Sequence, residues 1–391
     1  MRSRQSAQNW LYCTLVGVLG LYASTYQTLV DRLAARFGMD ERMIGVLLSV
    51  YAIGSLCSVL VSGMLSDSMG KRRVVLYAAL LMCLGLVCVA TAGGTVPLFV
   101  GLFLTGVGFG PSESIGSALL TDENPGSSTK WMNLSQIFFG VGAILAPLAA
   151  TWYLTLPGVD ASGALLICAG AVFLCWAAMA LTSGGRLQTP AGARRELNVF
   201  SVLKNREFLL YAVLIFVYLC YESIGPVYFR QLFLERGATE ADANLAISIF
   251  WAAMVLLRLV GVFMGGRELA CVRWLSPLIA VGVAVALLAQ SNGLRLLGVV
   301  LYGFGCGPVW PMLFVLASRV FPHRSGAAYA TMMLFSMAGN SLSPAILGSG
   351  VNNVEITFII CAFLSLAVAG GGWYAMRKYA APVSRPARGE M

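Results

Sequence analysis

Residues Gly63–Arg73 read GMLSDSMGKRR, an acidic residue and three consecutive cations in a turn between two long apolar segments. The segments on either side, at about 43–66 and 74–94, are long enough to cross the hydrocarbon core of a bilayer, which is about 30 Å thick. Cationic turns between membrane spans stay on the cytoplasmic side. The stretch therefore predicts two transmembrane helices joined by a short cytoplasmic turn.

The composition extends this prediction to the whole chain. Of its 391 residues, 58% are hydrophobic and 11% are charged, whereas a soluble domain carries about 25% charged residues. Apolar runs of about 20 residues recur throughout, which predicts an all-α membrane protein. We expect twelve transmembrane helices, at about 10–37, 43–66, 74–94, 97–121, 131–156, 162–183, 208–234, 244–266, 274–290, 295–319, 326–350 and 356–377.

The cations set the orientation of these spans, because every second loop is cationic. With the N-terminus inside, about 19 Lys and Arg residues fall on the cytoplasmic side and about six on the other. We therefore expect a multi-pass protein of the inner or plasma membrane with both termini in the cytoplasm. The net charge of +9 is spread over short loops, so we do not expect nucleic acid as a partner. We expect a monomer in the bilayer that binds a small-molecule substrate.

The chain also repeats itself at a distance of 197 residues. Residues 106–111 read GVGFGP and residues 303–308 read GFGCGP, and Gly142 and Pro147 recur as Gly339 and Pro344. The repeat predicts two six-helix halves, 1–183 and 208–391, joined by a cytoplasmic linker at 184–207. Because small residues let membrane helices approach closely, spans four and ten, and five and eleven, should form tight interfaces.

With these features together, the chain resembles the major facilitator superfamily along its whole length. The turn pattern G-x-L-S-D-x-x-G-K-R-R and the two six-helix halves carry this resemblance. Three stretches, 132–147, 221–237 and 308–330, resemble more narrowly the fucose-permease-like branch, whose members mostly move sugars with protons. The branch carries a Glu just after the Gly-rich stretch of span four, which Glu113 matches, and a polar residue on span five, which Gln136 matches.

Departures from that branch concern the substrate. Gln27 and Phe139 stand where the branch's fucose permease has an Asp and an Asn, which leaves either a sugar site with fewer polar groups or a different substrate. The Arg and the Gly-Pro pair of the family's drug antiporters are missing from FLTGVGFG and GAILAP, which disfavours drug/proton antiport. The second copy of the turn motif reads GGRELACVR at 265–273, without an Asp, and predicts a one-sided latch.

Three ionisable residues, Glu113, Glu222 and Arg258, lie well inside predicted spans. A charged residue at the centre of a membrane helix costs about 2.5–3.5 kcal/mol, so these groups should face a wet cavity or one another. Burial favours the protonated form of a carboxyl, as a proton carrier requires. We interpret Glu113 as the proton carrier and Glu222 as a substrate ligand or second proton site. The alternative is a salt bridge from Arg258 that serves only stability.

Other candidates surround the predicted cavity. Aromatic rings beside amides suit sugars, which present apolar faces and hydroxyls, although such rings also pack ordinary helix interfaces. Beside Tyr22 and Tyr51, the candidate substrate ligands are Tyr26, Gln27, Gln136, Trp251, Arg258, Trp310 and Asn340. The candidate conformational latch comprises Gly63, Asp67, Gly70, Lys71, Arg72 and Arg73. The single histidine, His323, falls in a basic loop and is expected to be solvated.

The sequence thus predicts a proton-coupled importer of a small polar solute, and not an enzyme. No metal-ligand spacing and no nucleophile motif occurs in it, so we expect no cofactor apart from the coupling proton. The alternative is export or import of an organic anion or amphipathic compound with Arg258 as the anion ligand. A sensor with the same fold is a third reading, which the short loops disfavour.

Overall fold

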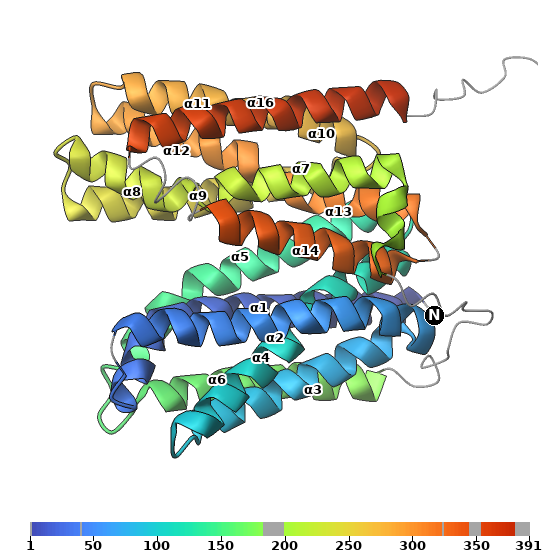
Figure 1. Cartoon of the computed structure of the whole chain (residues 1–391), viewed down its shortest axis with the longest axis vertical. Helices are drawn as coiled ribbons and strands as arrows, with labels where there is room; N and C mark the ends of the chain where they lie inside the picture. Colours follow the sequence, from blue (N-terminus) through green and yellow to red (C-terminus); the bar gives the residue numbers. More distant parts are fainter. Residues whose placement is uncertain (1, 40, 183–198, 323, 344–352, 380–391) are drawn as a thin grey trace, which may run out of the picture.

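The computed structural model describes the chain except for residues 1, 40, 183–198, 323, 344–352 and 380–391. Every regular element in the described part is a helix (Figure 1). A first set comprises α1 (Arg2–Arg36), α2 (Glu41–Met69), α3 (Lys71–Ala90), α4 (Thr95–Asp122), α5 (Ser128–Tyr153) and α6 (Ala161–Thr182). A second set comprises η1 (Val199–Lys204), α7 (Arg206–Glu222), α8 (Gly225–Glu235), α9 (Glu240–Gly261), α10 (Glu268–Leu275), α11 (Pro277–Leu288), α12 (Asn292–Cys306), α13 (Val309–Val320), α14 (Ser325–Ser343) and α16 (Val354–Lys378).

Eleven segments of the described chain are long and apolar enough to cross a membrane. They coincide with eleven of the predicted spans. The remaining predicted span, 326–350, overlaps α14 and residues outside the described part, so the number twelve stays a prediction. His323, Pro344 and most of the predicted linker also lie outside the described residues.

Three spans that the sequence predicted as continuous are in fact broken. Span seven divides into α7 and α8, span nine into α10 and α11, and span ten into α12 and α13. Pro226 and Pro277 occupy the first turns of α8 and α11, and Pro308 precedes α13. Proline has no N–H and its ring crowds the preceding turn, so it starts a helix more readily than it continues one. Hydropathy alone could not reveal these breaks.

The two sets pack around separate hydrophobic cores and lie one above the other in Figure 1. The first core runs from Tyr12 to Met179, and the second is built mainly from residues between Val202 and Ala375. Within the first set α5 packs on α1 and α4 packs on α2 and α3, while in the second set α14 packs on α7 and α12 on α9 and α11. The chain therefore folds as two helical bundles with corresponding neighbours.

The 197-residue repeat is visible in the starts of the helices. The helices α3, α4 and α5 begin at Lys71, Thr95 and Ser128. Their counterparts α10, α12 and α14 begin 197 residues later, at Glu268, Asn292 and Ser325. The same spacing therefore relates both the sequence motifs and the ends of the helices.

The repeated glycines lie where backbones touch. A Cβ at Gly106 would lie 2.0 Å from the carbonyl oxygen of Tyr51, and one at Gly303 would lie 2.7 Å from that of Phe250. A Cβ at Gly142 would lie 2.0 Å from the carbonyl oxygen of Gly17, and one at Gly339 would lie 2.4 Å from that of Phe216. No larger residue fits without moving a helix. The tight interfaces predicted for spans four, five, ten and eleven are confirmed.

The two sets meet near the end of the bundle that carries the start of α3, the end of α4 and the starts of α5, α10 and α14. We call this the charged end, because Asp67, Lys71, Asp122, Glu268 and Arg319 lie there. Here α14 packs on α2 and α4, and α5 packs on α9 and α13. The geometry at this end is central to the site described next.

Candidate functional site

Arg258 of α9 joins the two helix sets at the break in span ten. Its side chain is 5% exposed. Its Nε donates to the carbonyl of Gly307 at 3.0 Å, and its Nη1 donates to the carbonyl of Gln136, on α5, at 3.3 Å. A helix that ends inside a membrane leaves carbonyls without intrahelical partners. Arg258 therefore caps the end of α12 and ties it to the other set.

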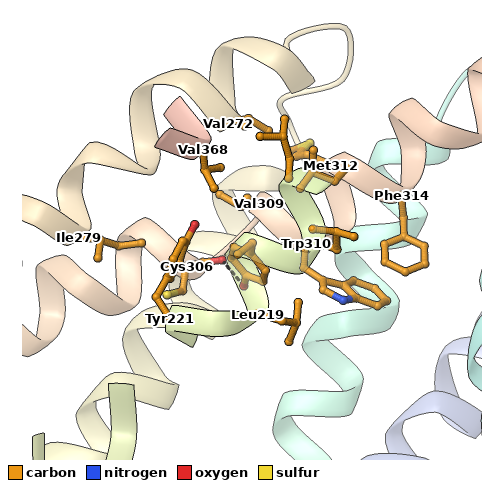
Figure 2. Packing of buried hydrophobic residues seen from close by; sticks show 14 of the residues in the cluster. Leu219, Tyr221, Val272, Ile279, Cys306, Val309, Trp310, Met312, Phe314 and Val368 are labelled. Atoms are coloured by element: carbon orange, nitrogen blue, oxygen red, sulfur yellow. Dashed lines mark hydrogen bonds between the residues drawn. The ribbon is translucent and has the colours of Figure 1, made fainter. Parts of the chain in front are cut away.

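Two tyrosines complete the capping of the broken spans. The hydroxyl of Tyr218, on α7, donates to the carbonyl of Cys306 at 2.9 Å, and that of Tyr302, on α12, donates to the carbonyl of Tyr221 at 2.8 Å. Each broken span thus caps the end of the other. Figure 2 shows Tyr221 beside Cys306 and the apolar side chains that surround this junction.

Glu113 and Glu222 both lie within the electrostatic reach of Arg258, but neither forms an ion pair with it. Glu113, on α4, is 8% exposed, and Glu222 is the last residue of α7. The charge of Arg258 acts on both carboxyl groups. Neither carboxylate forms a hydrogen bond or an ion pair with a side chain among the residues that the structure describes. One cation can balance only one of the two acids, so at least one carboxyl group is left without a counter-charge.

An aromatic cluster lies close to Glu113 in the first set. Tyr22 and Tyr26 stack with ring centroids 5.9 Å apart, and Tyr51 is tilted against both at 5.9 and 5.8 Å. The ring centroid of Tyr51 also lies 5.6 Å from that of Phe109. Tyr51 interacts electrostatically with Glu113. The cluster therefore connects α1, α2 and α4.

Three donors, two of them in this cluster and one on α5, are buried without a partner. These are the hydroxyls of Tyr22 and Tyr26 and the Nε2 amide of Gln136. Buried polar groups in folded proteins are almost always hydrogen-bonded, so such a group calls for an explanation. A polar ligand that reached them would supply the missing acceptors.

Other predicted ligands are not brought to this cluster. Gln27 and Asn340 are exposed and form no hydrogen bond with another described residue. Trp251 packs edge-on against Phe250 at 5.3 Å. The ring centroid of Trp310 lies 4.1 Å from that of Phe314 within the second core (Figure 2). The geometry of the two tryptophans is that of ordinary packing.

The predicted latch residue Asp67 reaches the other helix set. Its two carboxylate oxygens accept the backbone N–H groups of Gly326 and Ala327, at 3.1 and 3.0 Å, in the first turn of α14. A carboxylate here satisfies two N–H groups that have no helical acceptor and complements the helix dipole. Asp67 therefore acts as a cap supplied across the interface.

Close packing supports this cap. A Cβ at Gly63 would lie 2.5 Å from the Cβ of Ala330, so α2 approaches α14 closely there. Gly70 has a φ of +94° and allows the abrupt turn between α2 and α3. Lys71 pairs with Asp67 at 3.3 Å and with Asp122 at 3.1 Å. Asp122 also accepts the hydroxyl of Ser325, at 2.7 Å, from the second set.

Arg72 and Arg73 differ from the rest of the predicted latch. Arg72 pairs with Glu123 at 2.6 Å and donates to Gln8 at 2.8 Å, both within the first set. Arg73 follows in the first turn of α3. Both of these contacts of Arg72 stabilise the first helix set, and its role in the latch stays a prediction.

A second latch, which the sequence interpretation missed, lies in the other set. Glu268 is 2% exposed and accepts two bonds from Arg319, at 2.6 and 2.9 Å. It also accepts the hydroxyl of Thr129, at the start of α5 in the first set. The degenerate second copy of the turn motif therefore still joins the halves, although it has no Asp.

The two latches are related by the repeat with their charges reversed. Glu268 lies 197 residues after Lys71, and Arg319 lies 197 residues after Asp122. The cation and the anion have exchanged places while the ion pair has been kept. Applying the repeat distance to charged residues as well as to glycines would have found this pair in the sequence.

No group of three or more His, Cys, Asp or Glu residues within the described part of the chain could hold a metal ion. The unpaired donors and acids described above are instead suited to a polar solute and to protons.

Comparisons with known proteins agree with this architecture. A family model for the Major Facilitator Superfamily matches residues 12–344. An uncharacterized MFS-type transporter of Yersinia pestis is 24% identical over 367 residues, or 90% of this chain and 91% of that protein. The multidrug resistance protein MdtL of Shigella flexneri is 25% identical over 373 residues, or 91% and 94% of the two chains. The structure of FucP, a fucose:proton symporter of E. coli, in the outward conformation has a TM-score of 0.78 at 14% identity and covers 95% of this chain and 99% of that one.

Proposed function

Because this chain belongs to the Major Facilitator Superfamily, we propose that it carries a small polar solute, a sugar or a sugar-like metabolite, across the inner membrane by alternating access. It is a transporter and not an enzyme. Its two halves, 1–183 and 208–391, rock about the site between Glu113, Glu222 and Arg258. Protons drive the uptake, and the protein works as a monomer without another cofactor.

The observation that carries this proposal is the buried, unpaired carboxyl group of Glu113. This carboxyl group interacts electrostatically with Arg258 and with Tyr51. Desolvation makes an unpaired carboxylate costly, so the group gains stability by binding a proton when the site is closed. When the site opens to water the proton can leave. Glu113 therefore couples protonation to the conformational cycle, with Glu222 as a ligand of the substrate or of a second proton.

The unpartnered donors suit a polyhydroxylated substrate. The rings of Tyr22, Tyr26 and Tyr51 offer an apolar face, and the free hydroxyls and the Gln136 amide offer hydrogen bonds. Sugar hydroxyls would accept these bonds while the sugar's CH face packs on the rings. FucP, which has the same fold, is named as a fucose:proton symporter, in line with this substrate class.

In this proposal the charged end lies in the cytoplasm together with both termini, and twelve spans cross the membrane in the order predicted. The positive-inside rule supports this orientation. With the latches closed at that end, the conformation described here faces outward.

A Glu113→Gln variant tests the proposal. In proteoliposomes with an imposed pH gradient, a panel of labelled sugars first identifies the solute that the natural protein accumulates. The Gln variant should lose proton-driven accumulation of that solute but retain counterflow, because amide and carboxylic acid have the same shape. Glu235→Gln, which removes an exposed carboxylate that forms no ion pair with another described residue, is the control and should accumulate the solute normally. Intact uphill accumulation by Glu113→Gln would refute the role of Glu113.

A second candidate function is transport of an organic anion or amphipathic compound with Arg258 as the anion ligand. It is favoured by the relative named as a multidrug resistance protein. Arg258→Lys keeps the charge but cannot reproduce both backbone contacts. Selective loss of anion transport in that variant would support the ligand role. Normal transport after the exchange of Glu222 and Arg258 would instead assign Arg258 to an ion pair.

A further inference from the structure

A cavity of about 540 Å³ opens at the charged end of the second helix set and is lined by residues of α7, α10, α13 and α16. Figure 1 labels these four helices. Leu269, Val320 and Met376 supply an apolar lining, and Tyr379 adds an aromatic one. The cavity lies apart from Glu113, Glu222 and the tyrosine cluster, none of which lines it. Its volume is within the range of small-molecule sites, about 300–1,000 Å³.

The equivalent place in the first helix set is filled. There the space between α1, α3, α4 and α6 is only about 20 Å³. Its lining includes Arg72, Glu123 and Met179, and the first two form the ion pair at 2.6 Å. The 197-residue repeat places Leu269, Val320 and Met376 at the same three positions. The second set thus has two short apolar side chains where the first has an ion pair between a buried arginine and a half-buried glutamate.

Two acids and two arginines lie around the cavity, and one of the arginines can bind an anionic group. The carboxylate of Glu207 accepts the hydroxyl of Tyr211 at 2.8 Å, and that of Glu268 is held by Arg319 and Thr129. The charge of Glu268 is therefore balanced by Arg319, whereas Glu207 accepts a hydrogen bond from a neutral hydroxyl and keeps its own charge. Arg267 is exposed, lines the cavity and forms no side-chain hydrogen bond or ion pair with another described residue. Arg267 is therefore a cation at the rim that an anionic group could pair with.

We propose that this cavity is a binding site for a small amphipathic organic anion. The carboxylate or phosphate head of the ligand pairs with Arg267, and its short apolar body packs against Leu269, Val320 and Met376. The apolar body of the ligand fills the space that the Arg72 side chain occupies in the first set. The anionic head of the ligand takes the role of the Glu123 carboxylate, which the second set lacks. This site is separate from the transport site and does not depend on the identity of the transported solute.

The test uses the purified full-length protein and a photoactivatable eight-carbon carboxylate as the probe. Labelled peptides are mapped by mass spectrometry, with octanoate and octylamine as competitors. Labelling should fall on α10, α13 or α16 and be displaced by octanoate but not by octylamine. Labelling elsewhere only, or equal displacement by octylamine, would overturn the proposal.

Two variants test the geometry. Leu269→Arg with Val320→Glu transplants the ion pair of the first set and should reduce labelling at least about tenfold, because side chains then occupy a volume of the size that a ligand needs. Arg267→Gln should reduce it about fivefold, as expected for one exposed charge pair. Undiminished labelling in both variants would contradict the site. If the double variant fails to fold, Met376→Trp fills the same cavity without introducing a charge and must give the same loss.

The lipid composition of the nanodiscs shows whether the anion that binds is a lipid headgroup or a soluble molecule. Labelling is measured in nanodiscs of phosphatidylcholine alone and of phosphatidylcholine with phosphatidylglycerol. Displacement by the anionic lipid identifies a lipid ligand, and displacement by octanoate alone identifies a soluble one. Displacement by neither would refute the anion site.

Discussion

The two halves share a Gly-Pro pair in spans four and ten, but the residues directly after this pair differ between them. Residues 110–114 read GPSES and residues 307–311 read GPVWP. In the first half α4 runs on through Pro111, and the hydroxyls of Ser112 and Ser114 donate to the carbonyls of Gly108 and Gly110, at 2.7 and 2.9 Å. In the second half valine and a second proline replace these serines, and the helix breaks.

The consequence of the break is that the second half must find its donors elsewhere. Tyr218 and Arg258 supply them to the carbonyls of Cys306 and Gly307. The repeat places Trp310 where the first half has Glu113. One copy of the motif thus presents an acid to the site, while the other builds a break that fixes the neighbouring cation. The divergence of the halves thus places the buried acid in one half and the buried cation in the other.

The largest expected effect comes from removing that counter-charge. Arg258→Met deletes two charge-assisted hydrogen bonds to buried carbonyls and should destabilise the protein by about 3 kcal/mol. The measurement is chemical unfolding of the purified protein in detergent. Val61 occupies the equivalent position in the first half and is exposed, so Val61→Met is the matched control and should change little. Equal stability of the two variants would show that the break needs no cationic cap.

A smaller effect is expected from the tyrosine caps. Tyr218→Phe leaves the carbonyl of Cys306 at a helix end without its donor and should cost about 1 kcal/mol. Tyr12 makes the corresponding kind of contact in the first half, to the carbonyls of Ser112 and Glu113 within an unbroken helix. Tyr12→Phe should cost about half as much, because carbonyls inside a helix also accept backbone N–H groups. The same unfolding experiment compares the two, and the reverse order would break the comparison.

The smallest effect is expected at Arg72. Its contacts stay within the first half, so Arg72→Gln should shift the balance between closed and open charged ends by less than about 0.5 kcal/mol. Cysteine accessibility at the charged end measures this balance. A change in this balance as large as that caused by an Asp67 variant would show that Arg72 is part of the latch.

Much of the architecture follows from the sequence because hydropathy and repeated glycines report directly on burial and close approach. Gly106, Gly142 and their repeats lie at the contacts that their spacing predicted. The helix breaks were not predictable from the motif, since Gly110-Pro111 and Gly307-Pro308 are identical. The outcome depends on the residues that follow and on donors from distant helices.

The site shows the same limit. Glu113, Glu222 and Arg258 were found because charges inside a membrane are costly. Their mutual arrangement, with a cation that bonds to backbone rather than to either acid, depends on how α5, α9 and α12 pack. Glu268 was missed because an Asp was sought, whereas the repeat preserves an ion pair with its charges exchanged.

The most direct test of the account is a distance measurement across the charged end. Gly126 and Gly265 lie in the turns beside the two latches, and no atom lies within 4 Å of a Cβ added at either. Spin labels at cysteines placed there, in a background with the exposed Cys57 replaced by Ser, report the separation of the halves by double electron–electron resonance.

The account predicts a single short distance for the natural latches and a growing second, longer distance for Asp67→Asn, for Glu268→Gln and most of all for the double variant. A loss of about 2 kcal/mol would change the ratio of closed to open molecules about thirtyfold. An unchanged distance distribution in the double variant would contradict the claim that two latches of opposite polarity hold the halves together.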